Sequence, residues 1–386
     1  MSGLNSDHGD ARLWRVERLE RCDAHGRSRV SARVEGKTVW FESGDVPLAK
    51  SPEAFAAAFL VPALAQGTKI VMEEEVDGAW MDSVERLLPV WNRWWGYPRE
   101  SPVVCARSAH KLGQPVPRAG ACFTGGVDSF YTALRGRHPI DAMIFVHGFD
   151  IPLKDTGRMA AFEPVLRRVA KTLGKTSVVV RTNLRLHPCF AGVNWERSHG
   201  AALAATAHVL QSYIGRLIIP STYAYRSTGG WGSHWMTDAF WSSAAMNIVH
   251  DDATLSRREK LLRIASEPLL WDSLRVCWEN RRPSGNCSRC EKCLRTMVAL
   301  EAAGQLRHYT VFDQGVSLSA RLDRLPFIPP HLLRSFRNLR RERVPPDVRT
   351  ALTRLIRRTR IHVKPSALRR AVRCAKRLVH PGQGRC

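Results

Sequence analysis

The sequence contains no apolar run long enough to cross a membrane. A membrane-spanning helix needs roughly 18 or more consecutive apolar residues, and no stretch of the 386 residues approaches that length. The first residues also lack the basic stretch followed by an apolar stretch that marks a secretory signal. We therefore expect a cytoplasmic protein without a transmembrane segment.

Internal repeats and low-complexity tracts are absent too, which argues against a solenoid. The hydrophobic fraction of 44% is ordinary for a globular protein, so the chain can build a full core. Its length allows two domains, or one domain with large extensions.

Acidic residues are scarce near the C-terminus. From Arg321 onward the chain has nineteen Lys and Arg residues but three acids, and the net charge of the whole chain is +24. Two amphipathic patterns there, around Leu352 and Val372, combine an apolar face with basic residues. Such helices bind nucleic acid, anionic lipid or an acidic partner protein. A helical cap with a solvated basic face is the alternative.

Short apolar runs alternate with helical patterns between about residues 119 and 305. We expect strands over 120–123, 142–147, 177–181 and 216–220, and helices over 130–134, 163–173 and 201–213. This alternation predicts an α/β fold, in which helices cover both faces of a parallel sheet.

Three regions follow from these patterns. Residues 1–115 form a predicted α+β N-terminal domain of unknown role, residues 116–305 the α/β domain, and residues 306–386 a basic helical tail. In the first region we expect a hairpin over 30–41, a strand over 69–73, and helices over 54–65 and 81–95. Pro62 should kink or shorten the first helix.

A glycine loop, Phe123-Thr124-Gly125-Gly126-Val127-Asp128-Ser129, joins the first strand of the α/β domain to a helix. Glycines let the backbone approach phosphate closely, and the amides at a helix N-terminus bind anions. A carboxylate in such a cradle, Asp128, suits a magnesium ion held against the phosphates. The spacing fits neither the Walker loop nor the dinucleotide fingerprint. A tight turn with two glycines is the alternative.

Four of the ten cysteines are bunched, as Cys277-x9-Cys287-x2-Cys290-x2-Cys293. In a large intracellular chain such bunching indicates metal binding rather than disulfides. Four thiolates close a tetrahedral shell around zinc and leave no open position, which predicts a structural site. An iron–sulfur cluster and four buried free thiols are the alternatives.

The loop resembles the Ser-Gly-Gly-x-Asp-Ser loop of the PP-loop ATP pyrophosphatases. Together with the cysteine cluster, which ends in Cys293-Leu294-Arg295, it resembles the 7-cyano-7-deazaguanine synthase branch of that superfamily. The segments 256–260 and 197–200 are similar to its lysine- and arginine-containing segments. The resemblance covers roughly residues 119–300.

This resemblance implies an ATP-binding catalytic domain that cleaves ATP to AMP and pyrophosphate. It would activate a carboxylate or carbonyl oxygen for attack by ammonia or an amine, with ATP, Mg²⁺ and Zn²⁺ bound. We expect ATP to contact the loop and His147, catalysis to use Asp128, Ser129 and His234, and substrate or phosphate to meet Arg197, His199 and Lys260.

Several of these residues have a purely structural alternative. His147 fits a hydrogen-bonded histidine at a strand end, Lys260 a solvated face, and the loop of residues 229–235, which contains His234, a packed surface loop. Asp238 is a weaker candidate.

The first 115 residues, the tail and residues 221–241 depart from the synthase pattern, so we expect a different substrate. Two other functions remain open: modification of a tRNA base with the tail holding RNA, and nucleotide binding without catalysis.

Overall fold

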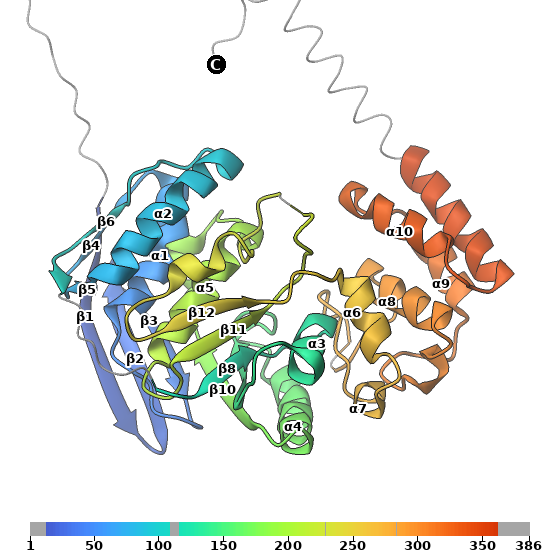
Figure 1. Ribbon diagram of the computed structural model, residues 1–386, viewed down its shortest axis with the longest axis horizontal. Helices are drawn as coiled ribbons and strands as arrows, with labels where there is room; N and C mark the ends of the chain where they lie inside the picture. Colours follow the sequence, from blue (N-terminus) through green and yellow to red (C-terminus); the bar gives the residue numbers. More distant parts are fainter. Residues whose placement is uncertain (1–12, 109–115, 228, 283, 362–386) are drawn as a thin grey trace, which may run out of the picture. The chain divides into compact units, whose positions relative to one another are not determined.

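The computed structural model describes residues 13–108, 116–227, 229–282 and 284–361. The chain forms two compact units, one up to Lys260 and one from Leu261 (Figure 1). The predicted amphipathic pattern around Val372 lies outside the described residues.

A mostly parallel sheet forms the centre of the first unit. Among the described residues it has ten strands in the order β12-β11-β8-β9-β10-β3-β2-β1-β4-β6 (Figure 1). Its parallel half consists of β8 (Ala119–Cys122), β9 (Ala142–His147), β10 (Thr176–Thr182), β11 (Arg216–Pro220) and β12 (Asn247–Asp251). The structure therefore confirms the predicted α/β class. It adds β12, which the sequence analysis did not identify.

The N-terminal strands extend this same sheet. They are β1 (Leu13–Ala24), β2 (Arg27–Val34), β3 (Lys37–Ser43), β4 (Lys69–Met72) and β6 (Val103–Val104). β3 pairs antiparallel with β10, where Phe41 lies opposite Thr182. The sheet is thus continuous across the predicted boundary at residue 115. A separate pair of short strands is β5 (Val76–Asp77) with β7 (Arg107–Ser108).

The hairpin of β2 and β3 was predicted, and its cause is local. Glu35 and Gly36 have positive φ angles of 48° and 73°, as a two-residue turn that matches strand twist requires. On β2, Val30, Ala32 and Val34 alternate with more exposed residues and are buried. The alternation fixes which face of the hairpin enters the core.

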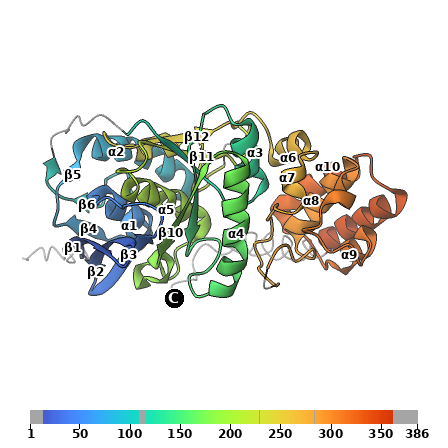
Figure 2. The same ribbon diagram turned by 90° about the horizontal axis from the view of Figure 1, so that it is seen from below.

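Helices cover both faces of the sheet. α3 (Val127–Arg135) and α4 (Thr156–Thr172) lie on one face, and α1 (Pro52–Gln66) and α5 (Trp195–Val209) on the other (Figure 2). α2 (Gly78–Trp95) packs on the short helix Asp238–Trp241 through Trp91 and Trp241, whose ring centroids are 5.5 Å apart. Other short 3₁₀ helices are Leu184–Leu186, Pro188–Phe190, Leu306–His308 and Pro330–Leu332.

Pro62 does not shorten the first helix, which was one of the two effects predicted for it. α1 continues to Gln66 and ends at Gly67, whose φ of 63° is left-handed. Proline removes one backbone donor, but residues Glu53 to Leu64 are all buried. Packing on nearly every side of the helix therefore outweighs the missing hydrogen bond.

The second unit is helical. Its helices are α7 (Pro268–Trp271), α8 (Glu291–Ala302), α9 (Leu318–Arg324), α10 (Leu333–Arg340) and a helix over residues 346–361, while α6 (Arg257–Ile264) crosses the division between the units. Leu352 and Leu355 are fully buried. This part of the basic tail therefore belongs to a core. None of the described helices combines the length and the apolarity needed to cross a membrane.

One close backbone contact holds the loop of residues 229–235 against α5. A Cβ added at Gly200 would lie 1.8 Å from the carbonyl oxygen of Gly232, and a Cβ at Gly232 would lie 2.7 Å from His199 Nδ1. The Gly232 amide donates to the Glu196 carbonyl oxygen at 2.7 Å. Two glycines thus allow the loop and the helix to touch.

We expect Gly200→Ala to destabilise the protein by about 1–3 kcal/mol, because one backbone must move away from the other. Gly157→Ala is the matched control, since its added Cβ meets nothing within 4 Å and alanine favours a helix by up to about 1 kcal/mol. Thermal melts of both variants test this. An equal melting temperature for the two variants would contradict the close contact.

Candidate functional site

The glycine loop lies where the sequence analysis placed it, between β8 and α3. The Phe123 amide donates to the Ile144 carbonyl oxygen at 2.7 Å, which ties the loop to β9. Gly125 has a φ of 73°, a conformation that favours glycine. Gly126 is the N-cap of α3. The amides of the first turn of α3 therefore lie at the positive end of the helix dipole, an arrangement that attracts anions.

Asp128 and Ser129 open α3, and both are buried. Ser129 Oγ donates to the Gly126 carbonyl oxygen at 3.0 Å, so its hydroxyl braces the loop. Asp128 Oδ2 accepts a hydrogen bond from Arg257 Nη1. Asp128 Oδ1 is buried and has no hydrogen-bond partner in the described part of the chain. A buried carboxylate oxygen of this kind calls for a further donor or a cation.

Two more carboxylates lie at the carboxyl end of β12, where Asp251 is the last residue of the strand and Asp252 comes next. Asp251 is fully buried, and its Oδ2 accepts from Thr132 Oγ1 at 2.6 Å. Its Oδ1 also lacks a partner among the described residues. Asp252 accepts a hydrogen bond from the Thr254 amide at 3.0 Å. Although burial opposes it, this hydrogen bonding lowers the pKa of Asp252, which is therefore ionised at neutral pH.

Lys260 is the cation at the centre of this group. Its side chain is fully buried, and Nζ donates to Ser221, at the carbonyl oxygen at 2.8 Å and at the hydroxyl. Nζ lies 5.4 Å from the centroid of the Tyr131 ring. Burial lowers the pKa of Lys260, while the carboxylates of residues 128, 251 and 252 act in the opposite direction. The alternative of a solvated face for Lys260 was wrong.

Arg197 and His199 lie elsewhere, on the first turns of α5, among aromatic side chains. The Arg197 guanidinium is 5.6 Å from the centroid of the Trp95 ring. The His199 ring is 5.7 Å from that of Trp231, and its Nδ1 lies 3.1 Å from the Trp195 carbonyl oxygen. Burial lowers the pKa of His199. No sequence signal predicted these aromatic neighbours, because they come from three separate segments.

His234 is buried, and both of its ring nitrogens have partners. Nδ1 accepts from the Met236 amide at 3.1 Å, and Nε2 lies 2.9 Å from the Ser227 carbonyl oxygen. Burial lowers the pKa of His234, so the ring is neutral at pH 7. These contacts favour the structural alternative for the loop of residues 229–235.

Asp238, the weaker candidate, organises that loop. It is fully buried, and it accepts hydrogen bonds from Ser233 Oγ at 2.7 Å and from the His234 amide at 2.9 Å. His250 Nδ1 lies 2.7 Å from Asp238 Oδ2. Burial, and then the charge of Asp238, raise the pKa of the thiol of Cys122, the last residue of β8, to about 12. Cys122 directly precedes Phe123.

His147 ends β9, and its Nε2 lies 3.1 Å from the Pro152 carbonyl oxygen. Burial lowers its pKa. This is the arrangement expected of the strand-end alternative. His147 also lines a cavity of about 450 Å³ with residues of α4 and β10, including Thr156, Met159 and Arg181.

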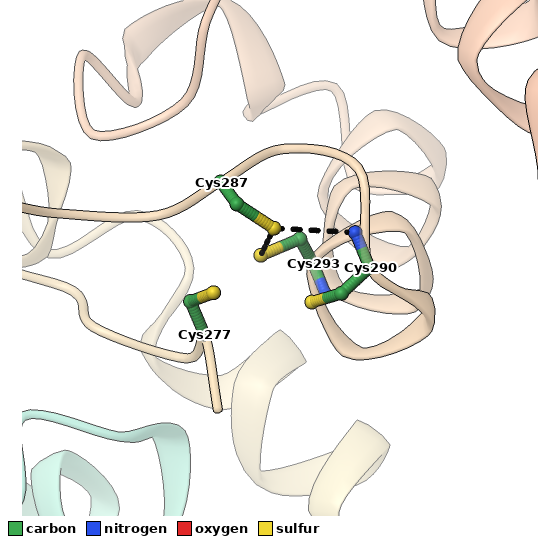
Figure 3. Close-up of side chains that lie close together, drawn as sticks. All are labelled: Cys277, Cys287, Cys290 and Cys293. Carbon is green, nitrogen blue, oxygen red and sulfur yellow. Dashed lines mark hydrogen bonds between the residues drawn. The ribbon is translucent and has the colours of Figure 1, made fainter. Parts of the chain in front are cut away.

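In the second unit the four bunched cysteines meet. Their sulfur atoms all lie within 4.8 Å of one another, and all four residues are buried (Figure 3). Figure 3 shows the side chains pointing toward a common centre from two segments of chain. Cys290 is the N-cap of α8, and its Sγ accepts from the Cys293 amide at 3.4 Å. The cluster is therefore able to hold a metal ion such as zinc.

Two buried polar side chains shape the backbone around this cluster. Asn286 Oδ1 accepts from the amides of Val276 at 2.8 Å and Cys277 at 3.1 Å, and its Nδ2 donates to the Leu274 carbonyl oxygen at 2.8 Å. The first cysteine is thereby held beside the other three. The cysteine spacing gave no signal of this role for Asn286.

Arg321 supports the turn between Cys287 and Cys290. It is buried and donates to the carbonyl oxygens of Ser288 at 3.2 Å and Asp313 at 2.9 Å. Ser288 has a φ of 54°, which is uncommon for a residue other than glycine. The sequence shows Arg321 only as one of many arginines, so its function was missed.

The sequence analysis also missed Ser221, Asp251, Asp252 and Arg257. A signal was present for the aspartates, because Asp251 and Asp252 come one residue after the apolar pair Ile248 and Val249. Carboxyl ends of parallel strands are the usual place for ligands. The missing step was to recognise residues 247–251 as a strand.

No protein-family model matches the chain, and neither a curated protein nor a solved structure matches it. The likeness to PP-loop enzymes therefore stays a prediction based on the motifs, and function is inferred from the geometry of the site.

We expect purified protein to carry about one zinc ion per chain, because four thiolates form a closed shell. Elemental analysis measures this, and a chelator should lower the melting temperature. Cys290→Ser should reduce zinc content and soluble yield, whereas Cys22→Ser, at an exposed position, should change neither. Stoichiometric iron with a brown colour would contradict a zinc site.

Proposed function

We propose that this protein is an ATP-dependent adenylating enzyme that releases pyrophosphate at the loop of residues 123–129. The observation that carries the proposal is that Asp251 and Lys260 lie near Asp128 of this loop and near the helix that the loop opens. A phosphate cradle, carboxylates and a buried cation are the groups that phosphoryl and nucleotidyl chemistry requires.

The position of the group in the sheet supports this proposal. β8 lies between β9 and β11, so the chain runs outward from β8 in both directions, to β9 and β10 on one side and to β11 and β12 on the other. In open α/β sheets, ligands bind at the carboxyl ends of the strands at such a switch point. The glycine loop follows β8 and Ser221 follows β11, one on each side of it.

The protein's own groups have distinct parts in the proposed reaction. The amides of the glycine loop and of the first turn of α3 bind phosphate oxygens and stabilise the negative charge of the departing pyrophosphate. Lys260 adds a positive charge that Ser221 and the Tyr131 ring hold in place. Because these groups are already oriented, little reorganisation is needed when charge develops.

Magnesium fits the carboxylates of this site. Mg²⁺ prefers oxygen ligands, and Asp128 Oδ1 and Asp251 Oδ1 are two buried carboxylate oxygens without partners in the described residues. These two aspartates would hold the ion, and a bound Mg²⁺ would offset phosphate charge. Arg257, which pairs with Asp128 Oδ2, would then keep that carboxylate oriented.

For the acceptor we propose a small-molecule carboxylate or carbonyl oxygen, activated as an adenylate and then attacked by ammonia or an amine. This is the chemistry of the 7-cyano-7-deazaguanine synthase branch, which the two motifs resemble, and we propose a different substrate. Arg197, beside the Trp95 ring, is a candidate partner for a substrate carboxylate, since arginine binds carboxylates in a bidentate manner.

We expect ATP turnover with the correct acceptor to yield AMP and pyrophosphate, and Asp128→Asn to lower it at least about 100-fold. Ser129→Ala should have a smaller effect, because that hydroxyl donates to the Gly126 carbonyl oxygen. Labelled ATP with separation of the products measures both.

Asp82→Asn is the matched control, because Asp82 is exposed and pairs with Arg107. All variants should keep the zinc content and the melting temperature of the wild type within a few degrees. ADP as the product of the wild type, or full activity in Asp128→Asn, would show that the loop is not the pyrophosphate-releasing site. Intact ATP with every acceptor tested would favour nucleotide binding without catalysis.

A further inference from the structure

Two helices of the second unit enclose a cavity whose lining is mostly arginine. Its volume is about 460 Å³. Its lining residues are Arg337, Arg340, Arg341, Thr353, Ile356, Arg357 and Arg360. Three of the arginines come from α10 and the residue after it, and two from the helix over residues 346–361. None of these seven described lining residues is acidic.

These five arginines differ from other arginines nearby in their lack of ion pairs with the described residues. On the same helix, Arg354 and Arg358 pair with Asp323. None of the five cavity arginines forms an ion pair with any residue in the described ranges. In addition, the Nε atom of Arg337 is buried and lacks a hydrogen-bond partner within that part of the chain.

Five guanidinium groups around one cavity repel one another, so the arrangement has a free-energy cost that a bound anion would remove. The helices are held in place by their apolar sides: Phe336 and Leu339 of α10 and Leu355 of the partner helix are buried. The cavity is therefore a built feature of the unit. If these arginines were only exposed, flexible side chains, charge repulsion would move them apart.

We propose that this arginine cavity binds the phosphates of a nucleic-acid strand. The planar fork of guanidinium matches phosphate oxygens in a bidentate manner. Several phosphates in succession would neutralise more of these arginines at once than one monovalent anion does. An acidic protein partner fits less well, because protein interfaces depend on buried apolar anchors, and Ile356 is the only apolar residue in the lining.

This proposal is independent of the adenylation chemistry. The cavity lies entirely within the second unit, and its residues are separate from those of the glycine loop. Failure of ATP turnover would not contradict the arginine cavity as a binding site. Failure of nucleic-acid binding would not contradict the adenylating site. If the protein both turns over ATP and binds nucleic acid, the results favour an enzyme that acts on RNA.

The test compares two triple variants of the full chain. One changes three exposed cavity residues to Gln, namely Arg341, Arg357 and Arg360. The other changes three exposed arginines outside the cavity, namely Arg324, Arg334 and Arg343. Both lose the same charge, so a general electrostatic effect would be equal in the two. Circular dichroism and zinc content check that both are folded.

Fluorescence anisotropy with a labelled oligouridylate, over a series of salt concentrations, measures binding. We expect the cavity variant to bind at least about tenfold more weakly and its salt slope to be smaller by about 2, since each lost contact to a single strand removes about 0.7 from the slope. The control variant should change affinity by less than about threefold.

Three outcomes would overturn the proposal. Equal losses in the two variants would assign binding to diffuse charge, and unchanged binding in the cavity variant would exclude the cavity. If inorganic pyrophosphate or polyglutamate competes as effectively as the oligouridylate at equal charge, the cavity recognises charge in general and not a nucleic-acid strand.

Discussion

The candidate site depends on one buried cation, Lys260. Three aspartates act on its pKa, and carboxylates removed from water need a positive charge nearby to stay ionised. Lys260 reaches Ser221 after β11 and the Tyr131 ring of α3. One side chain of α6 thus links the end of a central strand to the helix that follows the glycine loop. Loss of that charge would leave buried carboxylates without compensation.

A second constraint is backbone geometry, which acts in both units. In the first, Gly200 and Gly232 allow α5 and the loop of residues 229–235 to touch. In the second, Asn286 and Arg321 use their side chains to hold the turns that carry the cysteines. Buried polar groups of this kind stabilise a structure only when they are satisfied. Their hydrogen bonds also determine where the sulfur atoms lie.

The basic helices combine two properties that the sequence shows only as a pattern. Their apolar sides are part of a core, as Leu352 and Leu355 show. Two of their arginines pair with Asp323, and five others are among the described residues that line a cavity. A charge run is often a solvated face, but this one has a concave part where charges of one sign are gathered. That concentration of charge is the physical basis for anion binding.

Sequence alone was sufficient wherever the cause is local. Short stretches of sequence determine the glycine loop, the turn at Glu35 and Gly36, and the cluster of four cysteines. Each is found in the structure at the predicted residues. The α/β class also followed from the alternation of apolar runs and helical patterns.

Tertiary structure alone decided the pairing of β3 with β10, the burial of Lys260 and the survival of α1 past Pro62. Lys260 and Asp128 are separated by more than a hundred residues. His234 was a candidate acid or base by residue type, but both of its ring nitrogens have partners in the structure. Such outcomes depend on contacts between distant segments. The free energy of burial that settles them is a property of the packed chain, and no short stretch of sequence contains it.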